Sequence, residues 1–110
     1  MDDLTRQRDE LIAKLNQAVS DHREYGRKKA HAEYEYRVAL AEKIITLRAE
    51  NQPVTIINDL ARGADEIALL RLKRDLADAT HSSSIEAINN YKLQLRMVEG
   101  QMAREWGHTV

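Results

Sequence analysis

Apolar residues recur every three or four positions along almost the whole chain, which is the spacing of one face of an α-helix. Near the N-terminus, Leu4, Leu11, Leu15 and Ala18 follow this period. The pattern predicts a first helix over about residues 3–51. Acidic residues stand near its start, where the positive end of the helix dipole favours them.

The second half of this expected helix carries two apolar lines rather than one. Together they cover more of the helix than the roughly 100° of surface that faces a single partner. A hairpin supplies only one partner helix, so we expect the second line to form an interface between copies of the chain. The first line is Val38, Ala41 and Ile45, and the second line, the expected oligomer interface, is Tyr36, Leu40, Ile44 and Leu47.

The helical pattern breaks at "NQPVTIINDLARG", residues 51–63. Pro53 has no backbone N–H to donate and cannot continue the first helix. Thr55 is the expected N-cap of a short helix over about 55–62, which Gly63 ends. This segment therefore predicts a packed corner between two long helices.

The helical period returns for a last helix over about 65–106, with Gly107 as its stop signal. Its spacing of three and four residues is interrupted by a four-four step near the three serines at 82–84. The expected buried line is Leu69, Leu72, Leu76, Ala79, Ser83, Ala87, Tyr91, Leu95, Val98 and Met102.

These elements predict an all-α fold, with residues 1–110 as a single helical domain. It is a long antiparallel helical hairpin, coiled-coil-like, with a short corner helix. Folding the hairpin is expected to bring Tyr91 against Gly26 and Leu95 against Val19. A glycine inside a helix costs about 1 kcal/mol relative to alanine, and close packing of Tyr91 is the expected compensation. The doubled apolar lines predict assembly into a helical bundle, as a homodimer or higher oligomer.

The amino-acid composition is typical of an all-α fold and disfavours several classes of function. The 110 residues include one proline, four glycines and no phenylalanine. Seventeen basic residues nearly balance eighteen acidic ones, which disfavours both a basic nucleic-acid coat and an acidic DNA mimic. Zero cysteines exclude disulfides and fit a reducing cytoplasm. The polar N-terminus does not resemble a signal peptide, and no apolar run approaches the ~20 residues of a membrane helix.

A first candidate binding face lies in the middle of the first helix. Arg23, Arg27, His31 and Tyr34 follow at spacings of four, four and three, so they share one edge of that helix. Such an edge can contact a protein partner, or hold phosphates with its arginines and stack a base on its tyrosine. The alternative reading is a solvated rim whose charges pair with neighbouring glutamates.

A weaker alternative is a metal site. Asp78 and His81 stand three residues apart, as in the Glu-x-x-His pairs of di-iron helical bundles. The expected hairpin brings Glu33 and Glu35 opposite them. Because Asp reaches less far than Glu and Asp78 lies nearly opposite the expected apolar line, we expect no metal and no cofactor.

Nothing in the sequence forms a catalytic set. The serines at 82–84 stand beside His81, but adjacent residues on a helix point apart. There is no glycine-rich phosphate loop and no nucleophile elbow. We expect no enzyme activity. Trp106, the single tryptophan, is expected to pack on Leu11 or Ile12, with an exposed anchor for a partner as the alternative.

One group of proteins resembles this chain over residues 32–106. The runs that carry the resemblance are "AEYEYRVALAEKIITLRAENQPVTIINDLARG", "EIALLRLKRDLADA" and "AINNYKLQLRMVEGQMAREW". They look like small, uncharacterised helical proteins of phages and prophages of Gram-positive bacteria. The resemblance implies a phage origin and a role in the host cytoplasm during infection, but no active site. Small phage proteins are often inhibitors or adaptors of host machinery, or accessories to phage DNA metabolism.

The sequence thus predicts a non-enzymatic, phage-encoded interaction protein. It would bind and modulate a host or phage protein in host defence or DNA metabolism. The alternative is an oligomeric binder of phosphate-rich ligands, either nucleic acid or a signalling nucleotide. A carboxylate and histidine metal-binding bundle comes third.

Overall fold

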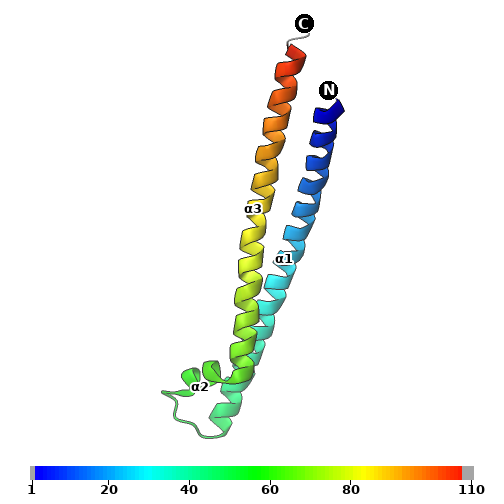
Figure 1. Cartoon of the computed structure of the whole chain (residues 1–110). Coiled ribbons are helices and arrows are strands. Elements are labelled where there is room, and N and C mark those ends of the chain that lie inside the picture. The colour runs from blue at the N-terminus through cyan, green and yellow to red at the C-terminus, as the bar shows by residue number, and fades with distance from the viewer. Residues whose placement is uncertain (1, 108–110) are drawn as a thin grey trace. The chain divides into compact units, whose positions relative to one another are not determined.

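The computed structural model describes residues 2–107, and within this range every regular element is an α-helix. In chain order they are α1 (Asp2–Ala49), α2 (Ile57–Gly63) and α3 (Asp65–Gly107). Figure 1 shows α1 and α3 as the two long helices, with α2 in the connection between them. The predicted fold class, an all-α hairpin of two antiparallel helices with a short corner helix, is confirmed. Helix α1 runs without interruption through Gly26.

Helix α1 ends at a left-handed residue rather than at Pro53. Asn51 has a φ of 62°, a conformation that asparagine tolerates better than most residues. Its backbone N–H donates to the carbonyl of Arg48, and the N–H of Gln52 donates to the carbonyl of Leu47, at 3.0 and 3.2 Å. This pair of bonds is the Schellman arrangement, which satisfies carbonyls at a helix end. The predicted end at residue 51 therefore overshoots by two residues.

Helix α2 begins later than the sequence predicted, and without a side-chain cap. Ile56 occupies the N-cap position, where no side chain accepts a hydrogen bond from the helix. The prediction that Thr55 caps α2 is wrong, because Ile56 rather than Thr55 is the N-cap residue. The N–H of Ile56 donates to the carbonyl of Pro53 and closes a turn before the helix. Ala64 is extended, with a ψ of 135°, so the chain changes direction there before α3 begins.

The chain divides into two compact units, and the first comprises Met1–Glu24 and Ser82–Val110. Within it, the start of α1 lies antiparallel to the end of α3 (Figure 1). A polar contact accompanies the apolar packing: His22 Nδ1 and Ser84 Oγ share a hydrogen bond of 2.6 Å. The buried apolar residues of this unit are Leu4, Leu11, Ala18, Ile88 and Met102.

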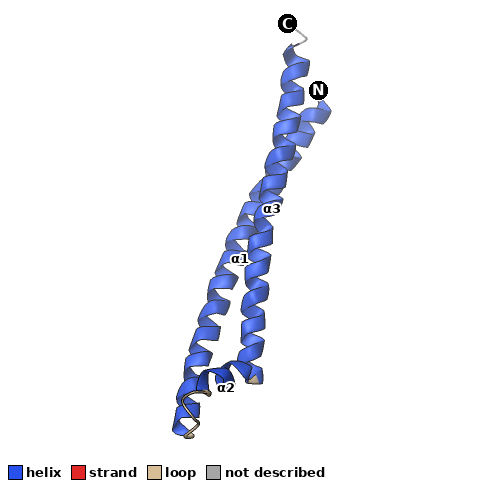
Figure 2. Ribbon diagram, turned by 90° about the vertical axis from the view of Figure 1, so that its left-hand side faces the viewer, coloured by secondary structure: helices blue, strands red, loops and turns tan. Residues whose placement is uncertain are grey.

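The second unit is Tyr25–His81, which contains the rest of α1, all of α2 and the start of α3. Figure 2 shows α2 crossing between the end of α1 and the start of α3. Leu47, Ile57 and Ala61 form a buried cluster, against which Leu40 and Ile44 pack. The corner of the hairpin is therefore a small apolar core of its own.

This cluster corrects the predicted oligomer interface. Tyr36 and Leu47 are buried within the chain, and Leu40 and Ile44 are half-buried against α2. The predicted contact with a second copy is wrong for Tyr36 and Leu47, because Arg74 of α3 lies over Tyr36 and α2 packs on Leu47. Leu40 and Ile44 are partly covered by the same α2 cluster. The other apolar line of α1 remains exposed.

The same placement of α2 shifts the register of the hairpin. Lys43, rather than a residue near the end of α1, pairs with Glu66 at the start of α3. His81 rather than Tyr91 covers Gly26, where an added Cβ would lie 3.3 Å from the Nε2 atom of His81. The predicted contact of Tyr91 with Gly26 is therefore wrong by almost three helical turns, at about 3.6 residues per turn.

The buried line of α3 was predicted correctly from Tyr91 onward and wrongly before it. In the first unit Tyr91, Leu95, Val98 and Met102 are buried or half-buried, as expected, but Ser83 and Ala87 are exposed. In the second unit the residues expected to be buried face solvent instead. The exposed ones are Leu69, Leu72, Leu76 and Ala79, and the positions that take their place are Ile67, Leu70, Arg74, Ala77 and His81.

Candidate interaction surfaces

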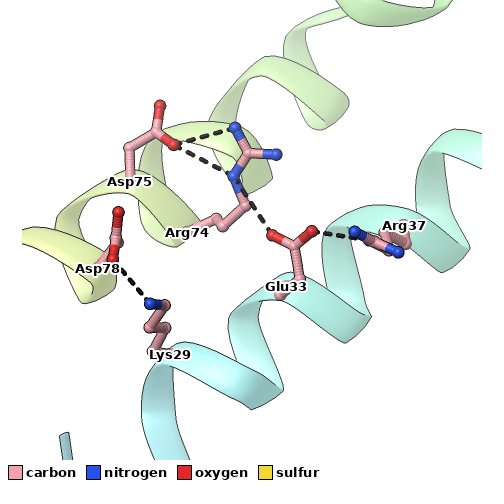
Figure 3. Close-up of polar contacts among 6 residues, drawn as sticks. All are labelled: Lys29, Glu33, Arg37, Arg74, Asp75 and Asp78. Atoms are coloured by element: carbon pink, nitrogen blue, oxygen red, sulfur yellow. Dashed lines mark hydrogen bonds and ion pairs between the residues drawn. The ribbon is translucent and has the colours of Figure 1, made fainter. Parts of the chain in front are cut away.

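Charged side chains join α1 to α3 in the second unit at four levels. Figure 3 shows two of these contacts, Lys29 with Asp78 and Glu33 with Arg74. The four ion pairs are Lys29–Asp78 at 3.0 Å, Glu33–Arg74 at 3.5 Å, Glu35–Lys73 at 2.9 Å and Lys43–Glu66 at 3.1 Å. Partly exposed pairs contribute little stability each, but a series of them along two helices fixes their register.

Arg74 occupies an inward position that an apolar residue usually fills. Its guanidinium lies over the ring of Tyr36, 4.5 Å from the centroid, which is a favourable cation–π geometry. Hydrogen bonding to Asp75 raises the pKa of Arg74, with smaller contributions from Glu33 and Tyr36. The aliphatic stem of Arg74 thus stands in for a leucine at this point of the hairpin.

Two carboxylates of this series have lowered pKa values. The hydrogen bond from Lys73 is the largest cause for Glu35, and His31 adds to it. For Glu66 the largest cause is its own backbone N–H, which is free to donate in the first turn of α3, and Lys43 comes second. Both carboxylates are solvated, so these shifts report local pairing rather than a buried charge.

The residues of the alternative metal site are occupied by these contacts. Glu33 and Glu35 bind cationic side chains, Asp78 binds Lys29, and His81 lies over Gly26. Among the described residues, no three histidine, aspartate or glutamate side chains lie close enough to share a metal ion. The shifted register explains this arrangement, because it places cations rather than glutamates beside Asp78.

The predicted binding face is exposed in both units. Arg23 belongs to the first unit, and Arg27, His31 and Tyr34 belong to the second. His31 lies 3.0 Å from Glu35 through its Nδ1 atom, so part of this face is paired within the helix. The ring of Tyr34 is mostly exposed.

The exposed face of α1 in the second unit continues as an apolar line. Tyr34, Val38, Ala41 and Ile45 follow at spacings of four, three and four, and all are exposed. Arg27 and His31 precede them at the same spacing, and Arg48 follows. We call the line from Tyr34 to Ile45 the α1 outer line. It is an apolar strip with cationic side chains at both ends.

A matching line on α3 was missed as a surface by sequence reasoning. Leu69, Leu72, Leu76 and Ala79 follow at spacings of three, four and three, and all are exposed. We call this set the α3 outer line. Its signal was present in the sequence but was assigned to the core, because its leucines are more apolar than the inward line that carries Arg74 and His81.

The first unit contains an open groove of about 650 Å³ between α1 and α3. Its apolar lining includes Leu11, Met97 and Val98, and Gly100 also lines it. Its polar lining includes Glu10, Lys14, Arg96 and Arg104. Trp106 is 44% exposed, so its side chain lies at the surface rather than in the core.

Comparison of the chain with protein-family models, with curated proteins and with solved structures gave no match. The class of molecule is therefore defined by its own geometry: an all-α hairpin whose described residues leave an apolar line exposed on each long helix. No helix among residues 2–107 is long and apolar enough to cross a membrane.

Proposed function

We propose that this chain is a non-enzymatic interaction protein, which self-associates and binds another protein whose activity it modulates. The observation that carries this proposal is the distribution of apolar side chains. Within residues 2–107, fourteen large hydrophobic side chains are exposed, against eleven buried hydrophobic residues. Nine of the fourteen lie in the unit Tyr25–His81. Scattered exposed apolar residues are normal, but contiguous lines of them mark contact surfaces.

The surface area supports the same proposal. The chain exposes 8075 Å², whereas a compact monomer of 12.6 kDa exposes about 6,200 Å². The excess of about 1,900 Å² is more than twice the ~800 Å² that each partner buries in a standard protein interface. A chain that buries so little of itself gains stability by covering this surface with another molecule.

The α1 outer line is the surface we assign to the protein partner. Arg27 and His31 continue this line at one end and Arg48 at the other. Arginine and tyrosine are the residue types that most often dominate the energy of protein interfaces. The resemblance to small phage and prophage proteins favours a host or phage protein of defence or DNA metabolism as the target.

The first test is light scattering at micromolar concentration, with the expectation of a homodimer or higher oligomer. A monomer would remove self-association from the proposal. Tagged protein is then used to capture partners from its own host cells, with Tyr34→Glu as the disrupting variant. Lys92→Glu, an exposed position in the first unit, is the control. A partner retained by the control and lost by Tyr34→Glu is then purified and assayed with and without the chain.

A second candidate is an oligomeric binder of phosphate-rich ligands. The exposure of both Arg27 and Tyr34 on one side of α1 favours it. Arg27→Ala and Tyr34→Ala should then abolish binding of single-stranded nucleic acid or a signalling nucleotide while the oligomer persists. Arg71→Ala on α3 is the control. Binding should weaken steeply with salt if several phosphates are neutralised, and unchanged binding in both α1 variants excludes this function.

A further inference from the structure

The α3 outer line has the geometry of a coiled-coil seam. Leu69, Leu72, Leu76 and Ala79 repeat at alternating spacings of three and four, the spacing of the core positions in a two-stranded coiled coil. Leu72 and Leu76 are more than half exposed, and Leu69 is 65% exposed. These three leucines form a continuous apolar ridge on the surface of the second unit.

Packing inside the unit does not use this ridge. The inward line of α3 there comprises Ile67, Leu70, Arg74, Ala77 and His81, all buried or half-buried. Helix α3 therefore presents two heptad lines. The inward line packs against α1, and the outer line has no partner helix among the described residues.

A second copy of the ridge fits this line when the two copies run antiparallel. Leu72 then faces Leu76 of the other copy, and Leu69 faces Ala79, so each layer of the seam is apolar. Such a contact has two-fold symmetry, so the pair of Leu72 with Leu76 occurs once in each direction, and so does the pair of Leu69 with Ala79. The alternation of a large and a small residue at the outer layers lets the helices approach closely.

The charges beside the ridge permit pairing with a copy of itself. Glu66, Lys73 and Asp75 flank the seam, and each pairs with an opposite charge of its own chain. In the antiparallel contact Lys73 comes beside Lys73 of the other copy and Asp75 beside its own counterpart, and the ion pairs within each chain offset the repulsion between these like charges. The α1 outer line differs, because Arg27, His31 and Arg48 continue it at both ends. Its apolar members are Tyr34, Val38, Ala41 and Ile45, with no leucine at a core position, so it is less suited to a coiled-coil seam.

We infer that the α3 outer line is the self-association interface, occupied by the same line of a second copy in antiparallel orientation. This inference rests on the proposed function, which requires self-association, and adds which helix forms the interface. It leaves the α1 outer line of each copy available to another protein. The area that the chain exposes beyond a compact monomer is sufficient for both contacts.

The test compares two substitutions at matched exposure. Leu69→Glu changes a side chain that is 65% exposed on α3, and Ile45→Glu changes one that is 66% exposed on α1. Sedimentation measures the dimer dissociation constant of each variant, and circular dichroism checks that both remain helical. Leu69→Glu should raise the constant at least about a hundredfold, because the symmetric contact places the new charge in both outer apolar layers of the seam. Ile45→Glu should change it less than about threefold.

The outcomes separate this inference from the proposed function. A wild-type protein that stays monomeric overturns both. A wild-type dimer that withstands Leu69→Glu but dissociates with Ile45→Glu overturns only the choice of α3. Loss of the dimer in both variants also overturns it, since the two surfaces would then act together.

Cysteine cross-linking tests the orientation, and the chain has no cysteine of its own. Chains with Leu72→Cys are mixed with chains with Leu76→Cys and oxidised. Antiparallel pairing predicts that the mixed disulfide forms faster than either homodimeric disulfide. Faster formation of the two homodimeric disulfides shows parallel pairing and overturns the antiparallel arrangement.

Discussion

The contact between Gly26 and His81 makes a quantitative prediction about two glycines. Gly26 in α1 and Gly100 in α3 both lie inside helices, and neither has a positive φ. Replacing a glycine by alanine inside a helix gains about 1 kcal/mol when the new methyl group has room. The two substitutions therefore share the same intrinsic gain and differ only in their surroundings.

The surroundings predict different outcomes. At Gly100 the nearest atom to a new Cβ is Nη1 of Arg104 at 3.7 Å, an ordinary contact, so Gly100→Ala should gain the full ~1 kcal/mol. At Gly26 the new Cβ would lie 3.3 Å from Nε2 and 3.5 Å from Cδ2 of His81. Because carbon contacts are most favourable at about 3.5–4.0 Å, the imidazole must move by a few tenths of an ångström. We expect Gly26→Ala to gain less than about 0.5 kcal/mol.

Urea unfolding at fixed protein concentration measures the change in the free energy of unfolding for both substitutions. A double-mutant cycle then shows whether His81 causes the difference between them. In a His81→Ala background the Gly26→Ala gain should rise to about 1 kcal/mol, while the Gly100→Ala gain should stay the same. Equal gains for the two glycines in the wild-type background would refute close packing of His81 on α1. A Gly26→Ala deficit that persists without His81 would assign the constraint to another group.

Three further predictions concern the core, the end of α1 and pH. Ile67 is 2% exposed, so Ile67→Ala should lower the free energy of unfolding by about 2–5 kcal/mol, measured by urea unfolding. The exposed control Val54→Ala should lower it by less than about 0.5 kcal/mol. Asn51 has a φ of 62°, so Asn51→Val should cost at least about 1 kcal/mol and Asn51→Gly almost nothing; equal thermal midpoints would contradict this. The pKa of Glu35 is lowered in the folded chain from its ordinary value of 4.5, chiefly by Lys73. The contribution of Glu35 to stability is therefore complete above pH 4.5, and it is lost as the pH falls through the lower pKa of the folded chain. Lys73→Met should therefore lose less stability than wild type on acidification from pH 6 to 3, and Lys92→Met should behave as wild type.

The sequence predicted the helices well, because the helical period and the residues that end a helix are local properties of the sequence. All three elements appear close to their expected positions, and Pro53 lies in the break between the first two. The exact ends of the helices were harder to predict. Asn51 ends α1 through a left-handed conformation, and asparagine is a less frequent choice there than glycine.

The buried line of α3 shows how a local pattern misleads. Counting back from Met102 in strict alternation of three and four gives Tyr91, Ile88, Ser84 and His81, then the observed inward line. The predicted line departs from this heptad at Ala87 with a four-four step, because the leucines beyond it are more apolar than the residues of the observed line. The unbroken heptad was the correct choice, although it buries polar side chains.

Those polar inward residues were unpredictable without the partner helix. Arg74 looks unfavourable as an inward residue until Tyr36 lies beneath it and Glu33 beside it. The register that brings them together depends on α2, which covers the end of α1 and delays the start of α3. The same register removed Glu33 and Glu35 from the position expected of metal ligands.

The exposed leucines and the polar inward line therefore have a common explanation. A helix with two heptad lines can turn either one toward its hairpin partner. In α3 the observed inward line continues the heptad that ends at Met102 without a break, and the charges beside it pair with Lys29, Glu33 and Glu35 of α1. Turning the leucine line inward would bury more apolar surface but break the charge series. The observed rotation satisfies the charges within the chain and leaves the most apolar line of the helix outside, where a second copy can cover it.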